Sequence, residues 1–146
     1  MTLFVSGCTH HCKNCFNPET WDFKLGEEFT DDTIARIIDL AREDYVRGLS
    51  ILGGEPFHPK TIDATLKLSK AFKEKYPNKD IWAWSGFLFD RDLKDKEVLK
   101  YIDVLVDGQY KDELHDFRLK WRGSANQRVI DVQKSIKKGK IILKEK

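Results

Sequence analysis

The sequence predicts an α/β fold with mostly parallel strands. Short apolar runs alternate along the chain with segments in which apolar residues recur at helical spacing, which is typical of parallel strands joined by helical crossovers. Several of the runs are apolar throughout, as in strands that are covered on both faces or closed into a barrel. Glycine-containing turns follow the clearest runs, at the points where parallel sheets assemble ligand sites.

The length and composition favour a single domain spanning residues 1–146. With 146 residues and 40% hydrophobic content, the chain has apolar material for one compact core but not for two. A complete (β/α)8 barrel takes about 200 residues or more, so a chain of this length can build only part of one.

Charge and hydropathy narrow the possible partners. The 26 Lys and Arg residues nearly balance the 24 Asp and Glu residues, and a net charge of +2 is not the footprint of a nucleic-acid binder. No apolar run approaches the roughly 20 residues needed to cross a bilayer, and the N-terminus lacks the pattern of a secretion signal. We therefore expect a cytoplasmic protein without a nucleic-acid or membrane partner.

The first expected element is a strand over residues 2–5, which leads through Ser6-Gly7 into a loop that contains cysteines. A helix follows, because Thr30 can cap its start and Gly48 is placed to end it. Its apolar positions recur at helical spacing and are Ile34, Ile37, Ile38, Ala41 and Tyr45.

The remaining elements repeat the order of strand, turn and helix. Residues 49–52 form a strand that stops at residues 53–56, and a helix follows from residue 62 to the break at Tyr76-Pro77. We then expect a strand over 81–84, a short helix over 95–101 and a strand over 102–106. Further on, residues 129–132 fit a strand, and the lysine-rich segment 137–146 fits a solvated edge strand or tail.

Cysteine usage points to a metal centre. All three cysteines, Cys8, Cys12 and Cys15, fall within eight residues, and an odd, clustered set is a ligand set rather than a disulfide framework. The C-x3-C-x2-C spacing lets three thiolates surround a 4Fe-4S cluster and leaves one iron without a protein ligand. A zinc site is the alternative and needs a fourth ligand, for which His10 or His11 is available inside the cramped loop.

Four groups of candidate functional residues follow predicted strands. They are the cysteine loop, Gly53-Gly54-Glu55-Pro56, Ser85-Gly86 and Asp107-Gly108. The carboxyl ends of parallel strands share one edge of a sheet, so we expect these groups to converge there. His10, His11, His58 and His115 are otherwise expected as surface or packing residues, and Trp82, Trp84 and Trp121 as core residues or partner contacts.

These motifs resemble those of the radical S-adenosylmethionine (SAM) superfamily. The cysteine spacing is the superfamily's defining motif, and the turn at residues 53–56 is similar to its second signature, which contacts the amino group of SAM. The chain most resembles the activating proteins of anaerobic ribonucleotide reductases, through Gly7-Cys8-x-His10-x-Cys12-x-x-Cys15-Phe16-Asn17, Thr20-Trp21, Trp84-Ser85-Gly86-Phe87, Asp103-Val104-Leu105-Val106-Asp107-Gly108 and Gly123-Ser124-x-Asn126-Gln127-Arg128-Val129-Ile130-Asp131.

The resemblance implies a fold, an activity and a set of cofactors. The fold would be a partial, open (β/α) barrel of the radical SAM type. A 4Fe-4S cluster held by the three cysteines would cleave SAM reductively, and the resulting radical would generate a glycyl radical on the anaerobic ribonucleotide reductase. The cofactors carry the difficult step, so the chain needs no catalytic side chain of its own.

The resemblance also implies binding residues and partners. Those assigned to SAM are Asn14, Cys15, Phe16, Gly53, Gly54, Glu55, Pro56, Ser85 and Asp107, and the metal ligands are Cys8, Cys12 and Cys15. The partners would be the glycine-bearing loop of the large reductase subunit and an electron donor such as flavodoxin.

The sequence departs from the family pattern in two places. Asn14 stands where the family usually has Gly, and the first strand begins almost at Met1, where the family has a preceding stretch of chain. Two alternatives stay open. One is another radical SAM enzyme, such as a pyruvate formate-lyase activase. The other is a non-catalytic iron–sulfur or zinc module, which would explain the cysteines but not the turn at residues 53–56.

Overall fold

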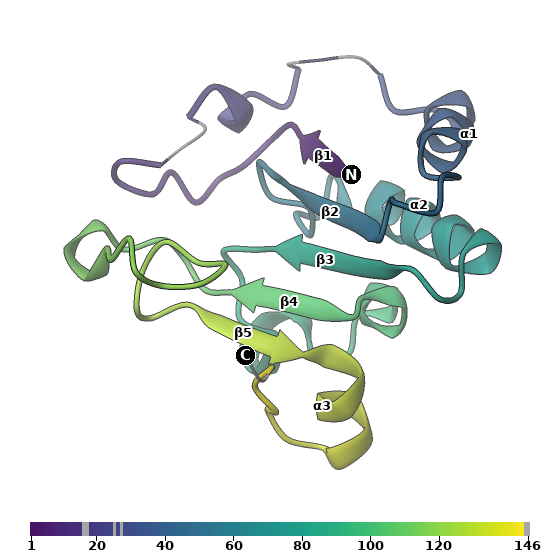
Figure 1. Cartoon of the computed structure of the whole chain (residues 1–146). Helices are drawn as coiled ribbons and strands as arrows, with labels where there is room; N and C mark the ends of the chain where they lie inside the picture. Colours follow the sequence, from purple (N-terminus) through teal and green to yellow (C-terminus); the bar gives the residue numbers. More distant parts are fainter. Residues whose placement is uncertain (16–17, 25, 27, 145–146) are drawn as a thin grey trace.

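The computed structural model describes residues 1–15, 18–24, 26 and 28–144, and within them five strands form one sheet (Figure 1). The strands are β1 (Thr2–Val5), β2 (Gly48–Gly53), β3 (Asp80–Trp84), β4 (Val104–Asp107) and β5 (Arg128–Asp131), and they lie in sequence order across the sheet. β1 to β4 pair in parallel, whereas β5 runs antiparallel to β4. The predicted α/β class and mostly parallel sheet are confirmed.

The helices α1 (Asp31–Leu40) and α2 (Ile62–Lys75) connect β1 to β2 and β2 to β3, and α3 (Val132–Lys138) follows β5. The short helical turns are η1 (Pro18–Trp21), η2 (Phe89–Leu93), η3 (Glu97–Tyr101) and η4 (Asp112–Leu114), and η2 and η3 lie between β3 and β4. Among the residues that the structure describes, no helix is both long enough and apolar enough to cross a membrane.

The helix α1 begins as predicted but ends earlier. The side chain of Thr30 accepts a hydrogen bond from the Thr33 amide and caps the helix. The helix stops at Leu40, so Tyr45 lies outside it and is exposed. Gly48 does not end the helix but opens β2, where a Cβ atom would lie 2.1 Å from the Asp80 carbonyl oxygen. Close pairing of β2 with β3 therefore requires this glycine.

The core lies between one face of the sheet and the helices. Alternate strand residues such as Leu49, Ile51 and Ile81 are buried there against Ile37 of α1 and Phe72 of α2. The expectation of strands covered on both faces holds for β4, which is buried along its length, but not for β2 and β3. On their other face these two strands carry half-buried residues, including both tryptophans of β3.

The C-terminal part differs most from the prediction. The expected short helix is a 3-10 turn, η3, and the strand predicted over 102–106 begins at Val104. Helix α3 was not predicted. It starts where the Asp131 carboxylate accepts a hydrogen bond from the Lys134 amide and ends at Gly139 in a left-handed conformation. The lysine-rich segment is thus split between this helix and a tail in which Leu143 bridges to Ile130.

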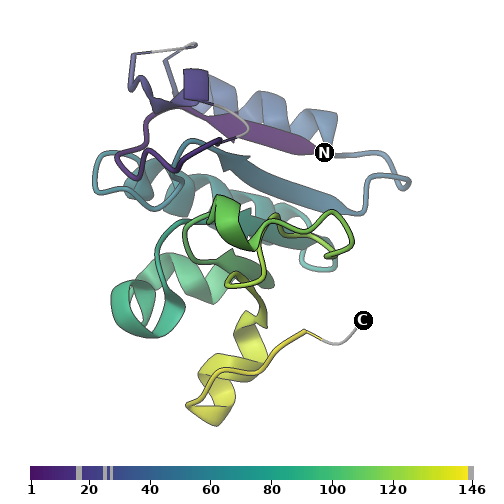
Figure 2. The ribbon, with the colours of Figure 1, turned by 90° about the vertical axis from the view of Figure 1, so that its left-hand side faces the viewer.

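The topology gathers the predicted functional segments at one edge of the sheet. The arrowheads of β1 to β4 point the same way in Figure 1, towards the cysteine loop and the segment 108–127. Figure 2, which is turned so that this edge faces the viewer, shows the purple loop and the green segment at the same end of the molecule.

Candidate metal centre

An open cavity of about 160 Å³ lies at this edge of the sheet and brings together most of the predicted site. Its lining residues are Cys8, His10, Cys12, Cys15, Leu52, Gly53, Gly54, Glu55, Trp84, Ser85, Gly86, Gly108, Tyr110 and Gln127. Asn14, Pro56 and Asp107 were predicted to bind SAM but do not line the cavity. Phe16 lies outside the described residues. The residues after β1, β2 and β3 therefore converge on the cavity as expected. After β4, Gly108 lines the cavity but Asp107 does not.

The cysteine loop owes its shape to local backbone contacts. The Cys8 amide donates to the Trp21 carbonyl at 3.2 Å, and the Cys15 amide donates to the Cys12 carbonyl at 3.1 Å. Asn14 has a φ of 57°, a left-handed conformation that Asn tolerates better than most residues other than Gly. Asn14 can therefore occupy the position where the family usually has glycine.

The three thiols have the chemistry that a metal cluster needs. All are free cysteines that reach the cavity while remaining partly exposed. Burial raises the pKa of Cys8 and Cys12 above the ordinary thiol value. A bound metal lowers the pKa of its sulfur ligands and displaces their protons, so raised values in the free chain are compatible with ligation.

The turn after β2 and the cysteine loop are built on one another. The Gly54 amide donates to the Val5 carbonyl, and the Glu55 amide donates to the Gly7 carbonyl, both at 2.7 Å. A Cβ atom on Gly54 would lie 2.5 Å from that Gly7 carbonyl oxygen. The glycine is therefore required by the packing of the chain against itself, whatever else binds there.

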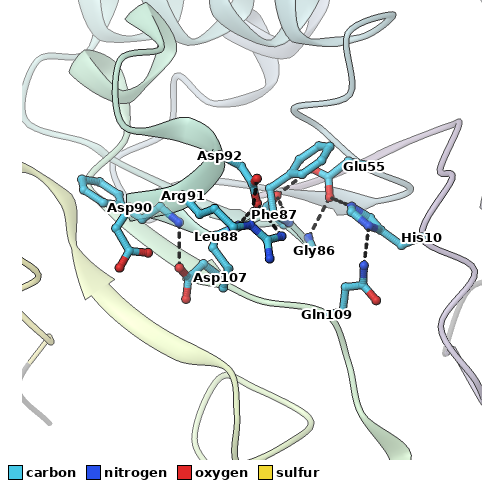
Figure 3. A network of polar contacts seen from close by, with 12 residues as sticks. His10, Glu55, Gly86, Phe87, Leu88, Asp90, Arg91, Asp92, Asp107 and Gln109 are labelled. Atoms are coloured by element: carbon cyan, nitrogen blue, oxygen red, sulfur yellow. Dashed lines mark hydrogen bonds and ion pairs between the residues drawn. The ribbon is translucent and has the colours of Figure 1, made fainter.

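Glu55 is the centre of a polar network (Figure 3). Its side chain is 1% exposed, and its Oε1 atom accepts hydrogen bonds from His10 Nε2 at 2.8 Å and the Gly86 amide at 2.7 Å. Its Oε2 atom accepts from the Ser85 hydroxyl at 2.7 Å and the Phe57 amide at 3.0 Å. The carboxylate thus ties together the cysteine loop and the ends of β2 and β3.

Asp107 is also committed to protein partners. The fully buried carboxylate accepts hydrogen bonds from Arg128 Nε at 3.0 Å and Nη2 at 2.6 Å, and from the Phe89 amide at 2.9 Å. Arg128 also binds the exposed Asp90 at 2.9 Å. These two carboxylates raise the pKa of the Arg128 guanidinium. The pair joins β4 to the antiparallel strand β5.

A second contact holds the cysteine loop from the other side. The Asn14 amide nitrogen donates to Asp112 at 2.9 Å, and the Tyr110 hydroxyl donates to the same carboxylate at 3.0 Å. The hydrogen bond from Asn14, followed by that from Tyr110, lowers the pKa of Asp112.

Two larger hollows, of about 570 and 340 Å³, lie on the uncovered face of the sheet and contain no cysteine. Both are lined by Trp84 and Trp121, and the smaller one shares Leu52, Trp84, Tyr110 and Gln127 with the cysteine cavity. Trp84 Nε1 donates to the Trp121 carbonyl at 2.7 Å. These hollows continue the cavity along the sheet, but the thiols that could bind a metal line only the cavity.

Sequence reasoning missed several lining residues. His10 was expected at the surface or in packing, and its ring does pack against Phe87, but it also lines the cavity and hydrogen bonds to Glu55. Leu52, the last residue but one of β2, and Trp84, the last residue of β3, line the cavity because both lie at the carboxyl ends of their strands. Tyr110 and Gln127 come from a segment without a recognisable element pattern, so only the family resemblance drew attention to Gln127.

The two histidines of the cysteine loop, on which the zinc alternative depends, contact other side chains. Within the described ranges, no three His, Cys, Asp or Glu side chains are arranged to hold a single metal ion. Both ring nitrogens of His10 already have partners, Glu55 at 2.8 Å and Gln109 at 3.1 Å. His11 stacks on Trp21 with their ring centroids 4.3 Å apart.

The fold, the site and a family comparison together define the chain as a protein of the 4Fe-4S single cluster domain family. Residues 1–130 match the family model described as a 4Fe-4S single cluster domain, in agreement with three cysteines grouped at the edge of an α/β sheet. A search of solved structures found no significant match.

Curated relatives specify the family. The chain is 46% identical over 129 residues to a protein of Vibrio cholerae, an alignment that covers 86% of this chain and 83% of the relative. It is also 40% identical to a protein of Enterobacteria phage T4, in an alignment that covers 88% of this chain and 81% of the relative. The identity to a protein of Escherichia coli K12 is again 40%, over 86% of this chain and 84% of the relative. Each carries the name anaerobic ribonucleoside-triphosphate reductase-activating protein. The chain belongs to the family of these activating proteins.

Proposed function

We propose that this chain is a radical SAM activase that generates a glycyl radical on the anaerobic ribonucleotide reductase. The observation that carries the proposal is the shared cavity, in which the three cysteines lie beside the Gly53–Glu55 turn. The relatives are named as activating proteins of an anaerobic ribonucleoside-triphosphate reductase, so that reductase is the proposed acceptor of the radical. The enzyme is an oxidoreductase whose difficult chemistry resides in its cofactors.

The three cysteines are the proposed ligands of a 4Fe-4S cluster. Their side chains reach one cavity, they form no disulfide, and the family model that matches the chain is that of a single-cluster domain. When bound and reduced, such a cluster supplies the electron that cleaves SAM, so that a hydrogen atom can be taken from a glycine Cα.

SAM is proposed to bind where the turn after β2 meets the cysteines. Gly53, Gly54, Glu55 and Ser85 line that part of the cavity. The carboxylate of Glu55 is already saturated by protein donors, so backbone atoms of the turn are the proposed contacts. Binding of SAM by Asn14, Phe16, Pro56 or Asp107 stays a prediction.

The fold and the partners are proposed in the same terms. The sheet would be part of an open barrel of the radical SAM type within a single domain, 1–146. Its uncovered face would leave room for a glycine-bearing loop of the large reductase subunit. An electron donor such as flavodoxin and a cytoplasmic location complete the proposal.

Electron paramagnetic resonance tests the function directly. Anaerobically reconstituted protein should hold about four irons per chain. Incubation with SAM, a reductant and the large reductase subunit should then give a stable protein-based radical doublet on the subunit. Turnover of a free small molecule without that doublet would favour another radical SAM enzyme. An iron-free protein with one zinc would favour a non-catalytic module.

A further inference from the structure

We propose that His10 is a positioning residue, which fixes the loop between the first two cysteines to the ends of β2, β3 and β4. The proposal deepens the proposed function, because it assigns a role at the same site. It rests on the contacts of His10 with Glu55, Gly86, Phe87 and Gln109, which Figure 3 shows around the ring.

Hydrogen bonds fix the orientation of the ring. A carboxylate only accepts hydrogen bonds, so His10 Nε2 is the donor to Glu55 and carries the proton. The other nitrogen, Nδ1, then accepts from the Gln109 amide group at 3.1 Å. The imidazole of His10 therefore links the cysteine loop both to the turn after β2 and to the residues after β4.

Packing leaves the ring little freedom. The Phe87 ring meets it edge-on with centroids 4.7 Å apart. A Cβ atom on Gly86 would lie 2.6 Å from the imidazole, so the absence of a side chain there makes room for His10. The ring thus occupies a slot formed by the residues that follow β3.

Glu55 gives the contact its rigidity. Four donors surround its two oxygens, and two of them, the Gly86 and Phe57 amides, belong to the backbone. A buried carboxylate is stable only when its hydrogen bonds are made. Displacement of His10 would remove one hydrogen-bond donor from the buried Glu55 carboxylate. The free-energy cost of that loss keeps the cysteine loop in place.

The test compares two substitutions of His10. His10→Phe keeps the ring contact with Phe87 but removes both hydrogen bonds, whereas His10→Gln can keep the donor to Glu55. His115→Phe is the matched control, because His115 makes ring contacts with Tyr110 and Phe117 and lies outside this network.

The first measurement is amide hydrogen exchange of the metal-free chain. His10→Phe should speed exchange by roughly tenfold at Gly86, whose amide donates to Glu55, and at the hydrogen-bonded loop amides of Cys8 and Cys15, because both hydrogen bonds of the ring are lost. His10→Gln should recover most of the protection, His115→Phe should retain it, and exchange within β3 should stay slow in all three. Unchanged exchange in His10→Phe would overturn the proposal.

The second measurement uses reconstituted protein. Because His10 is not a ligand, His10→Phe should retain its iron but bind SAM roughly tenfold more weakly, as followed by the change that SAM causes in the cluster's resonance spectrum. Loss of iron with intact exchange protection would instead make His10 a ligand. The exchange experiment needs neither cluster nor SAM, so it stands even where the proposed function fails.

A further variant covers the case in which His10→Phe does not fold. Glu55→Gln preserves the size of the side chain but replaces one acceptor with an amide that faces donors. It should show the same loss of protection at Gly86, Cys8 and Cys15. Normal protection in this variant would show that the carboxylate does not hold the loop.

Discussion

Two buried carboxylates near the carboxyl ends of β2 and β4 fix the positions of the residues that hydrogen bond to them. Glu55 and Asp107 are 1% and 0% exposed, and each accepts hydrogen bonds from both side chains and backbone amides. The sequence marked both positions, because each follows an apolar run and sits beside glycine. It did not reveal their partners, His10 and Arg128, which lie 45 and 21 residues away in the chain. Pairings over such separations depend on the tertiary fold.

The cysteines give the first prediction at this scale. Cys8→Ala, Cys12→Ala and Cys15→Ala should each abolish cluster retention and SAM cleavage, because a cluster held by three thiolates has no spare protein ligand. Iron analysis and the visible absorption of the reconstituted variants measure this. A variant that keeps full colour and activity would remove its cysteine from the ligand set.

Gly54 gives the second prediction. Gly54→Ala should lower the free energy of unfolding of the metal-free chain by about 1–3 kcal/mol, because the new methyl group meets the Gly7 carbonyl. Urea denaturation measures this. Gly139→Ala is the comparison, since its Cβ has no atom within 4 Å and reports only the strain of a positive φ. Unchanged stability with lost SAM binding would instead show that the glycine serves the ligand alone.

Asn14 gives the third prediction. Its hydrogen bond lowers the pKa of Asp112, so Asn14→Gly, which suits the left-handed backbone, should raise that pKa towards its ordinary value. The contact stabilises the fold at neutral pH, and its contribution is lost as the pH falls through the lowered pKa of Asp112. Nuclear magnetic resonance titration of the Asp112 carboxyl measures the shift. An unaltered titration would mean that Asn14 does not contribute and that Tyr110, with the charges of Lys13 and His115, lowers the pKa.

Among the elements, the prediction succeeded where local signals and tertiary packing agree. The strands at residues 2–5, 49–52 and 81–84 appear within one or two residues of the expected bounds, because each is an apolar run bounded by turn residues. The helix from Thr30 was predicted too long, since Tyr45 continued the helical spacing but the chain needed its glycine at position 48 to start β2. Helix α3 was missed because its lysines obscured a seven-residue segment with few apolar positions.

The junction of β4 with β5 gives the fourth prediction. Arg128→Leu should destabilise the chain by about 3 kcal/mol, because it leaves the buried Asp107 carboxylate without its cation. Asp90→Asn removes the exposed partner of the same arginine and should cost less than about 1 kcal/mol. Thermal or urea unfolding of the metal-free variants distinguishes them. Equal effects would contradict the assignment of Asp107 as the important partner.

For the whole molecule, the sequence predicted the convergence of the site better than its detail. Placing four turns after parallel strands was enough to bring three cysteines and the Gly53–Glu55 turn to one edge. The apolar pattern of the strands did not predict the open face of β2 and β3, because Trp82 and Trp84 make β3 apolar on both sides, whereas the family resemblance implied an open barrel.

This open face gives the fifth prediction. A short peptide that contains the target glycine should be a poor substitute for the intact large reductase subunit, because it lacks remote contacts that position the Cα. We expect a radical yield at least about tenfold lower at equal concentration, since one lost contact worth 1.4 kcal/mol suffices for that factor. Spin quantification measures the yield. Equal yields would place all recognition within the peptide.

The first strand has a consequence for how the protein matures. β1 lies at the edge of the sheet, pairs with β2 alone and fully buries none of its four side chains. Segments with so few neighbours open at a lower free energy than the core. We therefore expect β1 and the cysteine loop to open more readily than β3 and β4, with faster amide exchange in the metal-free chain. The proposed cluster would then be assembled at the margin of the sheet that is easiest to open.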